Sequence, residues 1–293
     1  MKRTIAFLLA AALAAFAQLA QAQPAAVVEG VQMPAWMERR SGNSSVRSPL
    51  AIGMELKGGD EVKTGAGARA LVRLSEGSTV KLGENASLAI SEMNPDSGGI
   101  FKAAMRVAEG AFRFTTDLLS KVRRREVSIR VATVTAGIRG TDLWGKSSGE
   151  RQTVCLIEGK IDVGAEGEQP VTMDQARQFY RREQGKTQAV GFVDAAQLAE
   201  WAKETEIEAG KGAARRGGKW QVVLASADSQ GPALALYDQL RAEGYAADIR
   251  PTQAGDKLQY RVRIAGLPSK TEAEALGAAL RGRFGIVEPK VSN

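Results

Sequence analysis

The stretch Ala70-Leu71-Val72-Arg73-Leu74-Ser75-Glu76-Gly77-Ser78-Thr79-Val80-Lys81-Leu82 contains two short β-strand patterns separated by a turn. The first strand is predicted over 70–74 and the second over 78–82, with Glu76-Gly77 as the turn. Val80 and Leu82 alternate with polar residues, so they share one face of the second strand. Similar short runs, separated by glycines, recur from Leu50 to Val190. This pattern predicts an all-β sandwich or roll over 50–190.

The composition indicates a globular protein, and the length suffices for two ordinary domains or one large one. The chain has 293 residues, of which 44% are hydrophobic and 25% are charged. Aromatic residues make up only 5%, while glycine occurs 32 times. Few aromatic residues and many glycines suit short strands and turns better than large helical cores.

The absence of histidine and the single cysteine exclude several kinds of site. A chain with 0 His and 1 Cys cannot form a Ser-His-Asp or Cys-His catalytic arrangement, a His-ligated metal site or a Cys-rich zinc site. Cys155 has no partner for an intramolecular disulfide, and its apolar run Val154–Ile157 predicts that it is buried. We expect no cofactor and no metal, although catalysis by carboxylates alone stays possible.

The first residues predict export. Lys2 and Arg3 precede an apolar run over 5–17, and Ala20-Gln21-Ala22 supplies the small residues of a cleavage site. This order is typical of a secretory signal peptide over 1–22, with the mature chain starting at Gln23. The alternative is a retained anchor, but the run is short for a hydrocarbon core about 30 Å thick. We therefore expect a periplasmic protein with no transmembrane helix in the mature chain.

The rest of the chain divides by composition and periodicity. Residues 23–49 are mixed and are predicted to be a partly ordered lead-in. A helix is predicted over 193–209 with Asp194 as N-cap, and Gly210–Gly218 has the composition of a linker. The last block, 219–293, has the pattern of a small α+β domain of order βαββαβ. Its predicted strands cover 220–224, 246–250, 259–264 and 287–291, with one helix over 232–243 and another that starts with a capping box at Ser269 and Glu272.

The last block resembles a SPOR domain. The resemblance rests on Tyr260-Arg261-Val262-Arg263-Ile264-Ala265-Gly266-Leu267, on Ser269-Lys270-Thr271-Glu272-Ala273 and on Trp220-Gln221-Val222-Val223-Leu224-Ala225-Ser226-Ala227. It covers about 75 residues, and Val223 stands where the family commonly has Gln. SPOR domains bind bacterial peptidoglycan, typically glycan strands stripped of their peptides. The resemblance therefore implies an envelope protein that binds denuded glycan strands, and it associates the chain with cell division.

The middle block resembles a FecR-type periplasmic domain. The matching motifs are Gly59-Asp60-Glu61-Val62-Lys63-Thr64-Gly65, Thr135-Ala136-Gly137-Ile138-Arg139-Gly140-Thr141-Asp142-Leu143 and Val154-Cys155-Leu156-Ile157-Glu158-Gly159-Lys160-Ile161. Such domains occur in envelope signalling proteins that relay iron-transport cues to a sigma factor. The resemblance implies a module that contacts other envelope proteins.

Alternation along the strand 259–264 defines a candidate binding face. Period two separates Tyr260, Val262 and Ile264 from Gln259, Arg261 and Arg263. If the apolar set faces the helices, the polar set lies on an open face, where arginine can pair with the lactyl carboxylates of the glycan. Gln221, on the first strand, and Ser226, which could point either way where that strand ends, complete the predicted glycan-binding set. The alternative is that these polar residues only solvate the sheet.

These observations favour a non-enzymatic periplasmic protein with a peptidoglycan-binding domain and a FecR-like scaffold module. One alternative is an envelope signalling protein of the FecR type that acts on a receptor or a sigma-factor regulator, which sizing of the mature N-terminus would help to distinguish. A cell-wall hydrolase is another alternative, with Asp142 and Glu158 as its best carboxylates. RNA binding is opposed by export and by the lack of paired aromatic residues on the exposed strand face, so we expect no nucleic acid partner.

Overall fold

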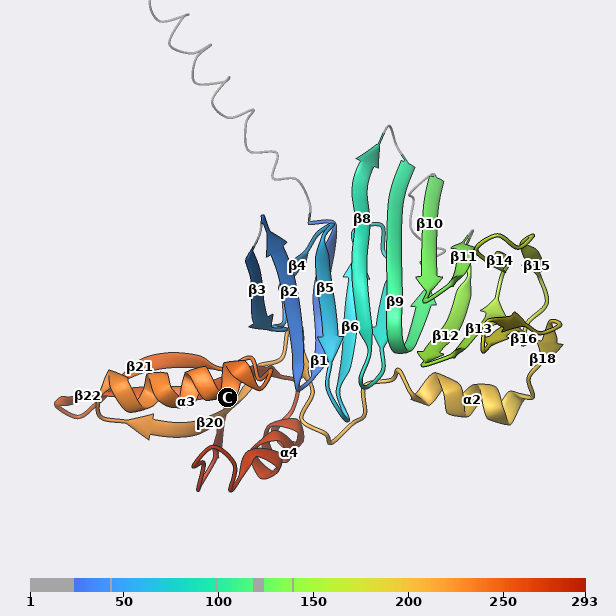
Figure 1. Cartoon of the computed structure of the whole chain (residues 1–293). Helices are drawn as coiled ribbons and strands as arrows, with labels where there is room; N and C mark the ends of the chain where they lie inside the picture. The colour runs from blue at the N-terminus through green and yellow to red at the C-terminus, as the bar shows by residue number, and fades with distance from the viewer. Residues whose placement is uncertain (1–23, 43, 98–99, 118–123, 139) are drawn as a thin grey trace, which may run out of the picture.

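The computed structural model describes residues 24–293 except 43, 98–99, 118–123 and 139. The predicted signal peptide and its cleavage site before Gln23 lie outside the described residues. The described chain forms a β domain of two layers, followed by a small α+β domain that extends from one end of it (Figure 1). The predicted fold class is confirmed.

The first layer of the β domain is an ordered row of antiparallel strands with one parallel pair. Neighbouring strands follow the order β3-β2-β5-β8-β9-β10-β11-β14-β15, and the parallel pair is β9 with β10. The bounds are β2 Ala35–Ser41, β3 Ser44–Pro49, β5 Asp60–Thr64, β8 Ser87–Ser97, β9 Ile100–Thr115, β10 Arg124–Val131, β11 Val134–Ile138, β14 Ile161–Ala165 and β15 Val171–Met173.

The second layer is antiparallel throughout. Its central order is β1-β6-β7-β9-β12-β13-β16, with β4 and β19 on the outer side of β1 and with β17 and β18 beside β16. The bounds are β1 Ala26–Gln32, β4 Glu55–Leu56, β6 Arg69–Leu74, β7 Thr79–Leu82, β12 Asp142–Ser148, β13 Arg151–Glu158, β16 Gln178–Glu183, β17 Lys186–Thr187, β18 Gly191–Phe192 and β19 Ala214–Arg215.

Strand β9 belongs to both layers. Its first half, up to Val107, pairs with β10, whereas its second half, from Gly110, pairs with β12. Gly110 has a positive φ of 82°, and a Cβ there would lie 2.4 Å from Ala86 Cα. Only glycine fits this bend, which carries the chain from one layer to the other. The two layers enclose one continuous apolar core that includes Leu88, Phe112 and Ile129.

The predicted hairpin over 70–82 forms as β6 and β7. Val72 lies opposite Val80, and Gly77 takes a φ of 101° in the turn. Glu76 is buried and accepts a hydrogen bond from the backbone N–H of Ser78 at 2.7 Å. A local polar contact therefore fixes the turn that the sequence marks with Glu-Gly.

The lead-in 23–49 differs from its prediction, because it contributes three full strands of the β domain. Arg39 on β2 donates to both carboxylate oxygens of Asp60, from Nε and Nη2, at 2.7 Å each. Asp60 is buried, and the hydrogen bond with it raises the pKa of Arg39. The charged stretch that was predicted to be only partly ordered is thus held by long-range ion pairing and strand pairing, which composition does not reveal.

Helix α2 covers one end of the second layer. It spans Ala195–Lys203, and the side chain of Asp194 caps it by accepting from the Gln197 N–H at 2.8 Å. Trp201 stacks on Trp144 with ring centroids 4.8 Å apart. The helix is shorter than predicted because Glu204 and Glu206 leave it and pair with basic side chains of the β domain, Lys146 at 2.7 Å, Lys81 and Arg113.

The C-terminal domain has the predicted βαββαβ order. It comprises β20 Trp220–Ala227, α3 Gln230–Ala242, β21 Asp248–Ala254, β22 Lys257–Leu267, α4 Lys270–Leu280 and β23 Lys290–Ser292, with sheet order β21-β22-β20-β23. The side chain of Ser269 caps α4 by accepting from the Glu272 N–H at 3.2 Å. Val262 and Ile264 of the sheet form one core with Leu240 of α3 and Leu276 of α4. Both helices therefore cover the face of the sheet that carries the apolar set.

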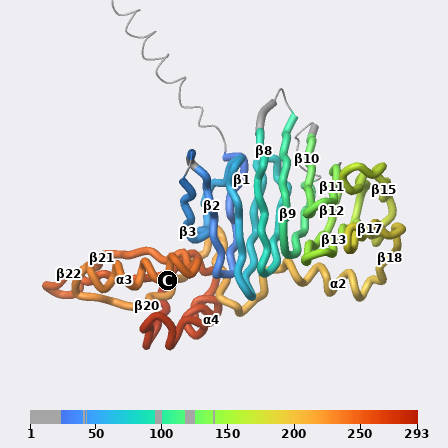
Figure 2. The backbone as a smooth tube through the Cα atoms, in the orientation of Figure 1, coloured from blue at the N-terminus to red at the C-terminus, as the bar shows by residue number. Residues whose placement is uncertain are grey.

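The segment 210–218, predicted as a linker, is built into both domains. Ala214 on β19 pairs with Val31 of β1, while Ala214 is also buried in the core of the C-terminal domain. The path of this segment between the domains can be followed in Figure 2. Glu272 anchors it: its carboxylate accepts from the backbone N–H groups of Gly210 at 2.6 Å, Gly212 at 2.7 Å and Ala213 at 3.1 Å. The predicted capping box is thus only half formed, because the Glu272 side chain points to the linker.

Candidate functional site

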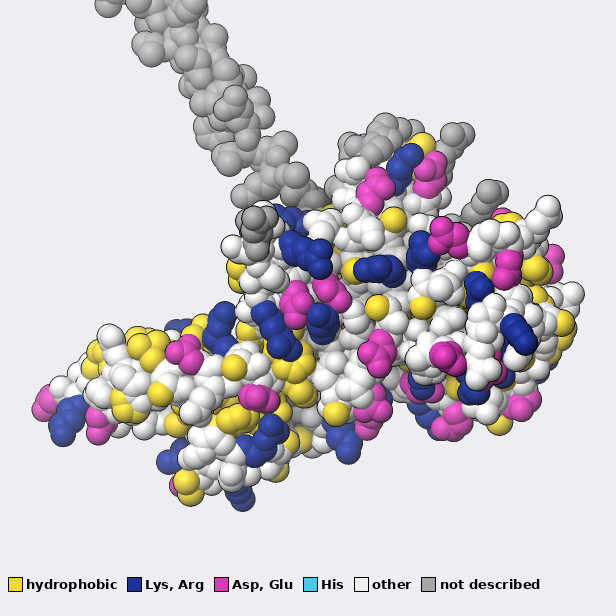
Figure 3. Space-filling model, viewed as in Figure 1, with side chains coloured by type: hydrophobic (Ala, Val, Ile, Leu, Met, Phe, Trp, Pro, Cys, Tyr) yellow, Lys and Arg dark blue, Asp and Glu magenta, His cyan; other side chains and the backbone are white. Residues whose placement is uncertain are grey.

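The face of the C-terminal sheet opposite the helices carries the predicted polar set. On β22, Gln259, Arg261 and Arg263 alternate with Val262 and Ile264, which are buried against the helices. The helix-covered side looks different, since hydrophobic side chains gather along it and Leu234 of α3 is 47% exposed (Figure 3). The two sides of this small domain therefore differ in chemistry.

A β-bulge decides where Ser226 points. The pairing register between β20 and β22 shifts between Val223 and Ala225, so that Ala225 lies opposite Val262 and Ser226 lies opposite Arg261. Residues directly opposite in an antiparallel pair share a face. Ser226 therefore lies on the polar face with Arg261. Ala225, which simple alternation places on that face, lies on the other one, because a bulge reverses the alternation beyond it.

Arg263 is already engaged within the protein. Its Nε donates to Asp248 Oδ1 at 2.7 Å and its Nη2 donates to Asp248 Oδ2 at 3.3 Å. Its Nη1 donates to Gln221 Oε1, and Gln221 in turn donates to Ser292 Oγ at 3.0 Å. This chain of hydrogen bonds crosses the whole sheet from the β21 edge to the β23 edge. It uses the donor groups of Arg263, whose side chain is only 18% exposed.

Arg261 differs from Arg263, because no hydrogen bond or ion pair holds it among the residues that the structure describes. It lies directly opposite Arg250 of β21, which is exposed and equally unpaired in the described part of the chain. Opposite residues in such a pair have Cβ atoms about 4.5–5.5 Å apart, and like charges at that separation destabilise a sheet. An anion between the two guanidinium groups would relieve this repulsion.

The complete row across the sheet is Arg250, Arg261 and Ser226, one residue from each of three strands. Gln259 stands at its border, where its Nε2 donates to Asp228 Oδ1 at 3.4 Å. Arg250 was not among the predicted site residues. The hairpin would have indicated it: Gly255-Asp256 is a two-residue turn signal, and a turn centred there places 250 opposite 261.

The carboxylates proposed for a hydrolase do not form a free pair. Asp142 accepts hydrogen bonds from Arg113, from Nε at 2.9 Å and from Nη2 at 2.7 Å. The hydrogen bond with Asp142 raises the pKa of Arg113. Glu158 lies opposite Asp142 on the neighbouring strand and is exposed. Both oxygens of Asp142 are thus held by a structural ion pair within the β domain.

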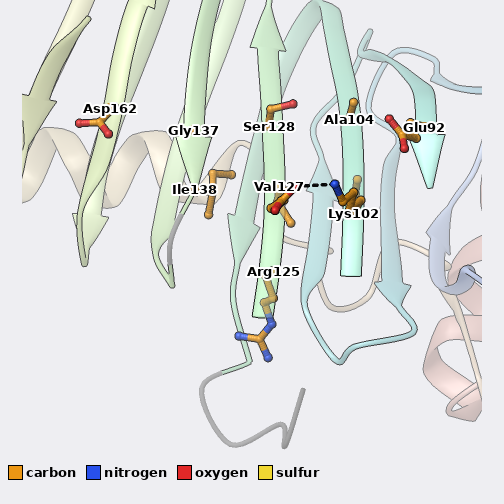
Figure 4. A pocket seen from close by; sticks show the side chains of 11 residues that line it. Glu92, Lys102, Ala104, Arg125, Val127, Ser128, Gly137, Ile138 and Asp162 are labelled. Atoms are coloured by element: carbon orange, nitrogen blue, oxygen red, sulfur yellow. Dashed lines mark ion pairs between the residues drawn. The ribbon is translucent and has the colours of Figure 1, made fainter. Parts of the chain in front are cut away.

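A shallow hollow of about 420 Å³ lies on the outer face of the first layer, over β9, β10 and β11 (Figure 4). Its charges are largely matched within the protein. Lys102 pairs with Glu126 at 2.9 Å, and Asp162 accepts from Thr172 Oγ1 at 2.7 Å. Figure 4 shows Glu92 and Asp162 on opposite sides of this hollow. Unlike the row on the C-terminal sheet, the hollow does not bring like charges together.

Two tryptophans of the β domain, Trp36 and Trp144, have partners within the protein and are not free to stack on sugar rings. Trp144 is 1% exposed and stacks on Trp201. Trp36 lies at the contact between the domains, where its Nε1 donates to the carbonyl of Ala242 at 3.1 Å.

None of the described helices has the length and hydropathy of a membrane span. The described residues also contain no group of acidic, cysteine or histidine side chains suited to hold a metal ion.

The fold defines a mostly β protein with a small C-terminal α+β domain, and comparison with known families identifies both parts. A family model described as FecR protein matches residues 60–162, and one described as SPOR domain matches residues 217–287. The chain therefore carries a FecR domain followed by a SPOR domain, and both resemblances found in the sequence are confirmed. Both families consist of binding or signalling domains without catalytic function and are typical of envelope proteins, and a SPOR domain implies peptidoglycan binding.

Comparison with curated proteins gives no match. Among solved structures, the chain is similar to a protein from Parabacteroides distasonis that is provisionally described as an anti-sigma factor, in two crystal structures. One is 13% identical and covers 68% of this chain and 98% of its own, with a TM-score of 0.39. The other is 15% identical and covers 75% and 89%, also with a TM-score of 0.39. Likeness at this level carries no argument about function.

Proposed function

We propose that the protein is a non-enzymatic periplasmic protein that binds peptidoglycan glycan strands through the polar face of its SPOR domain. One observation carries this proposal: Arg250 and Arg261 lie opposite each other on the open face of the sheet, and neither has an acidic partner among the described residues. Glycan strands without peptides bear a lactyl carboxylate on every second sugar, and two guanidinium groups side by side can hold such a carboxylate with parallel hydrogen bonds. Ser226 and Gln259 supply hydrogen bonds to sugar hydroxyl and acetamide groups.

The two arginines of β22 have different roles in this proposal. Arg261 contacts the carboxylate, together with Arg250. Arg263 is a positioning residue, because its ion pair with Asp248 and its hydrogen bond to Gln221 hold the neighbouring strands in register. Removal of Arg263 would also leave Asp248 as an unpaired negative charge beside the ligand.

Binding of purified sacculi tests the proposal. We expect the double variant Arg250→Ala/Arg261→Ala to lose at least tenfold in affinity, because each charge-assisted hydrogen bond contributes about 1.5–3 kcal/mol. The matched control is Lys270→Ala/Arg281→Ala, which removes two exposed positive charges from α4 and its C-cap in the same domain. Equal loss in both variants would indicate non-specific attraction to a polyanion, and unchanged binding of the first variant would refute the site.

The β domain is proposed as a scaffold or interaction module. Its FecR match also fits a second role, in which it contacts a receptor or a sigma-factor regulator of the envelope. Cross-linking of the full chain in living cells, with and without its SPOR domain, distinguishes the two roles. A signalling partner should remain bound to the β domain after the SPOR domain is removed, whereas a scaffold held only by glycan should lose its envelope contacts.

A further inference from the structure

The polar face leads into a cleft between the two domains. The cleft has a volume of about 320 Å³ and is lined by Met33 and Ile52 from the β domain, by Arg215 from the connecting segment, and by Ala246, Asp248 and Ala265 from the SPOR domain. Asp248 is the partner of Arg263, and Ala265 follows Arg263 on β22 by two residues. The cleft thus begins where the row of polar residues ends.

Glycines of the connecting segment and of β22 line one wall of this cleft. Gly218 lies so near the end of β22 that a Cβ would fall 2.2 Å from the carbonyl oxygen of Gly266. Gly266 itself has a φ of 81°. Glycine at both positions lets the connecting segment lie directly against the end of β22, so backbone and not side chains forms this wall of the cleft.

The lining combines three kinds of chemistry. Met33, Ile52 and Ala246 give an apolar wall, and Asp248 gives a carboxylate that is 53% exposed even in its ion pair. Arg215 is exposed, and in the described part of the chain its side chain has no hydrogen-bond or ion-pair partner. A ligand that fits all three would present a small apolar group, a hydrogen-bond donor and a carboxylate.

We propose that this cleft is a second subsite, which takes one N-acetylated, carboxylate-bearing sugar of the same glycan strand. The acetamide methyl group packs on the apolar wall, the acetamide N–H donates to Asp248, and the lactyl carboxylate accepts from Arg215. This inference rests on the proposed function of the polar face, which it extends. It makes the β domain part of the glycan site, since Met33 and Ile52 belong to that domain.

Titration of the full chain with peptide-free oligosaccharides of alternating N-acetylglucosamine and N-acetylmuramic acid tests the subsite. Longer oligosaccharides should bind the wild type more tightly than the disaccharide, and Arg215→Ala should lose about tenfold for the longer ones only. Ala265→Leu, which fills the cleft, should have the same effect. The control Arg216→Ala, which lines a different hollow, should change affinity less than twofold.

The outcomes separate this proposal from the one that it extends. If Arg250→Ala/Arg261→Ala abolishes binding while Arg215→Ala and Ala265→Leu leave it unchanged, the cleft is refuted and the polar face stands. If the wild type does not bind any of the oligosaccharides, the proposed function itself fails. Chitin oligosaccharides, which lack the carboxylate, should bind wild type and Arg215→Ala equally, and a loss with them would overturn the role given to Arg215.

Discussion

The contact of Glu272 with the connecting segment gives a prediction about how the two domains are joined. Glu272 is 8% exposed, and its carboxylate accepts from three backbone N–H groups, of which those of Gly212 and Ala213 are buried. Glu272→Ala leaves these two buried donors without a partner, at about 1–3 kcal/mol each. We expect the segment 210–216 to lose about 3 kcal/mol of local stability.

Limited trypsin digestion under native conditions measures this loss directly. Lys211, Arg215 and Arg216 are cleavage sites within the segment, and they are cut when it opens. A loss of about 3 kcal/mol raises the open population by roughly a hundredfold, and the cleavage rate should follow it. Glu272→Gln keeps the shape but loses the charge, so it should fall between wild type and Glu272→Ala.

The control is Glu274→Ala, on the same helix. Glu274 is exposed and pairs with Lys270 at 3.4 Å, an interaction worth about 0.5 kcal/mol or less. Its cleavage rate should stay within about twofold of the wild type. If Glu272→Ala is cleaved no faster than Glu274→Ala, the carboxylate does not hold the segment and the reasoning is wrong.

Two further predictions concern the β domain. Burial raises the pKa of the Cys155 thiol from 9.0 to about 12, so Cys155 should not react with a disulfide reagent at pH 8 in the folded protein but should react in urea. Because the unfolded thiol ionises first, this group should lower stability as the pH rises above about 9, and rapid labelling of the native protein at pH 8 would contradict its burial. Gly145→Ala should lower the free energy of unfolding by about 1–3 kcal/mol, since its Cβ would lie 2.4 Å from Phe112 Cε1. The control Gly231→Ala, where the Cβ meets nothing within 4 Å, should not destabilise the protein. Equal melting temperatures of the two variants would argue against this packing.

Sequence patterns over a few residues predicted the local structure of this chain well. The hairpin over 70–82, the cap at Asp194 and the alternation along β22 all formed as expected. Each depends on contacts between residues close in sequence, or on the preference of an apolar face for burial. Such features are encoded where they occur and need no knowledge of distant partners.

The composition of the sequence misled where distant contacts decide the structure. The lead-in reads as partly ordered because its charges are visible in the sequence and their partners are not. Asp60, which pairs with Arg39, lies 21 residues away. The glycine-rich segment reads as a flexible linker, but Glu272 provides the acceptors for its backbone from 60 residues away. Ordering these segments depends on hydrogen bonds to residues far away in the sequence, which form only when the chain has folded.

The candidate site shows the same division. The sequence by itself determined that β22 has an apolar and a basic face, because side chains alternate along any strand. Only the tertiary structure decided which residues meet on the basic face: strand register places Arg250 beside Arg261, a bulge turns Ser226 towards them, and Asp248 occupies Arg263. Register and bulges are properties of a pair of strands, set by the fit of two surfaces that are far apart in the chain.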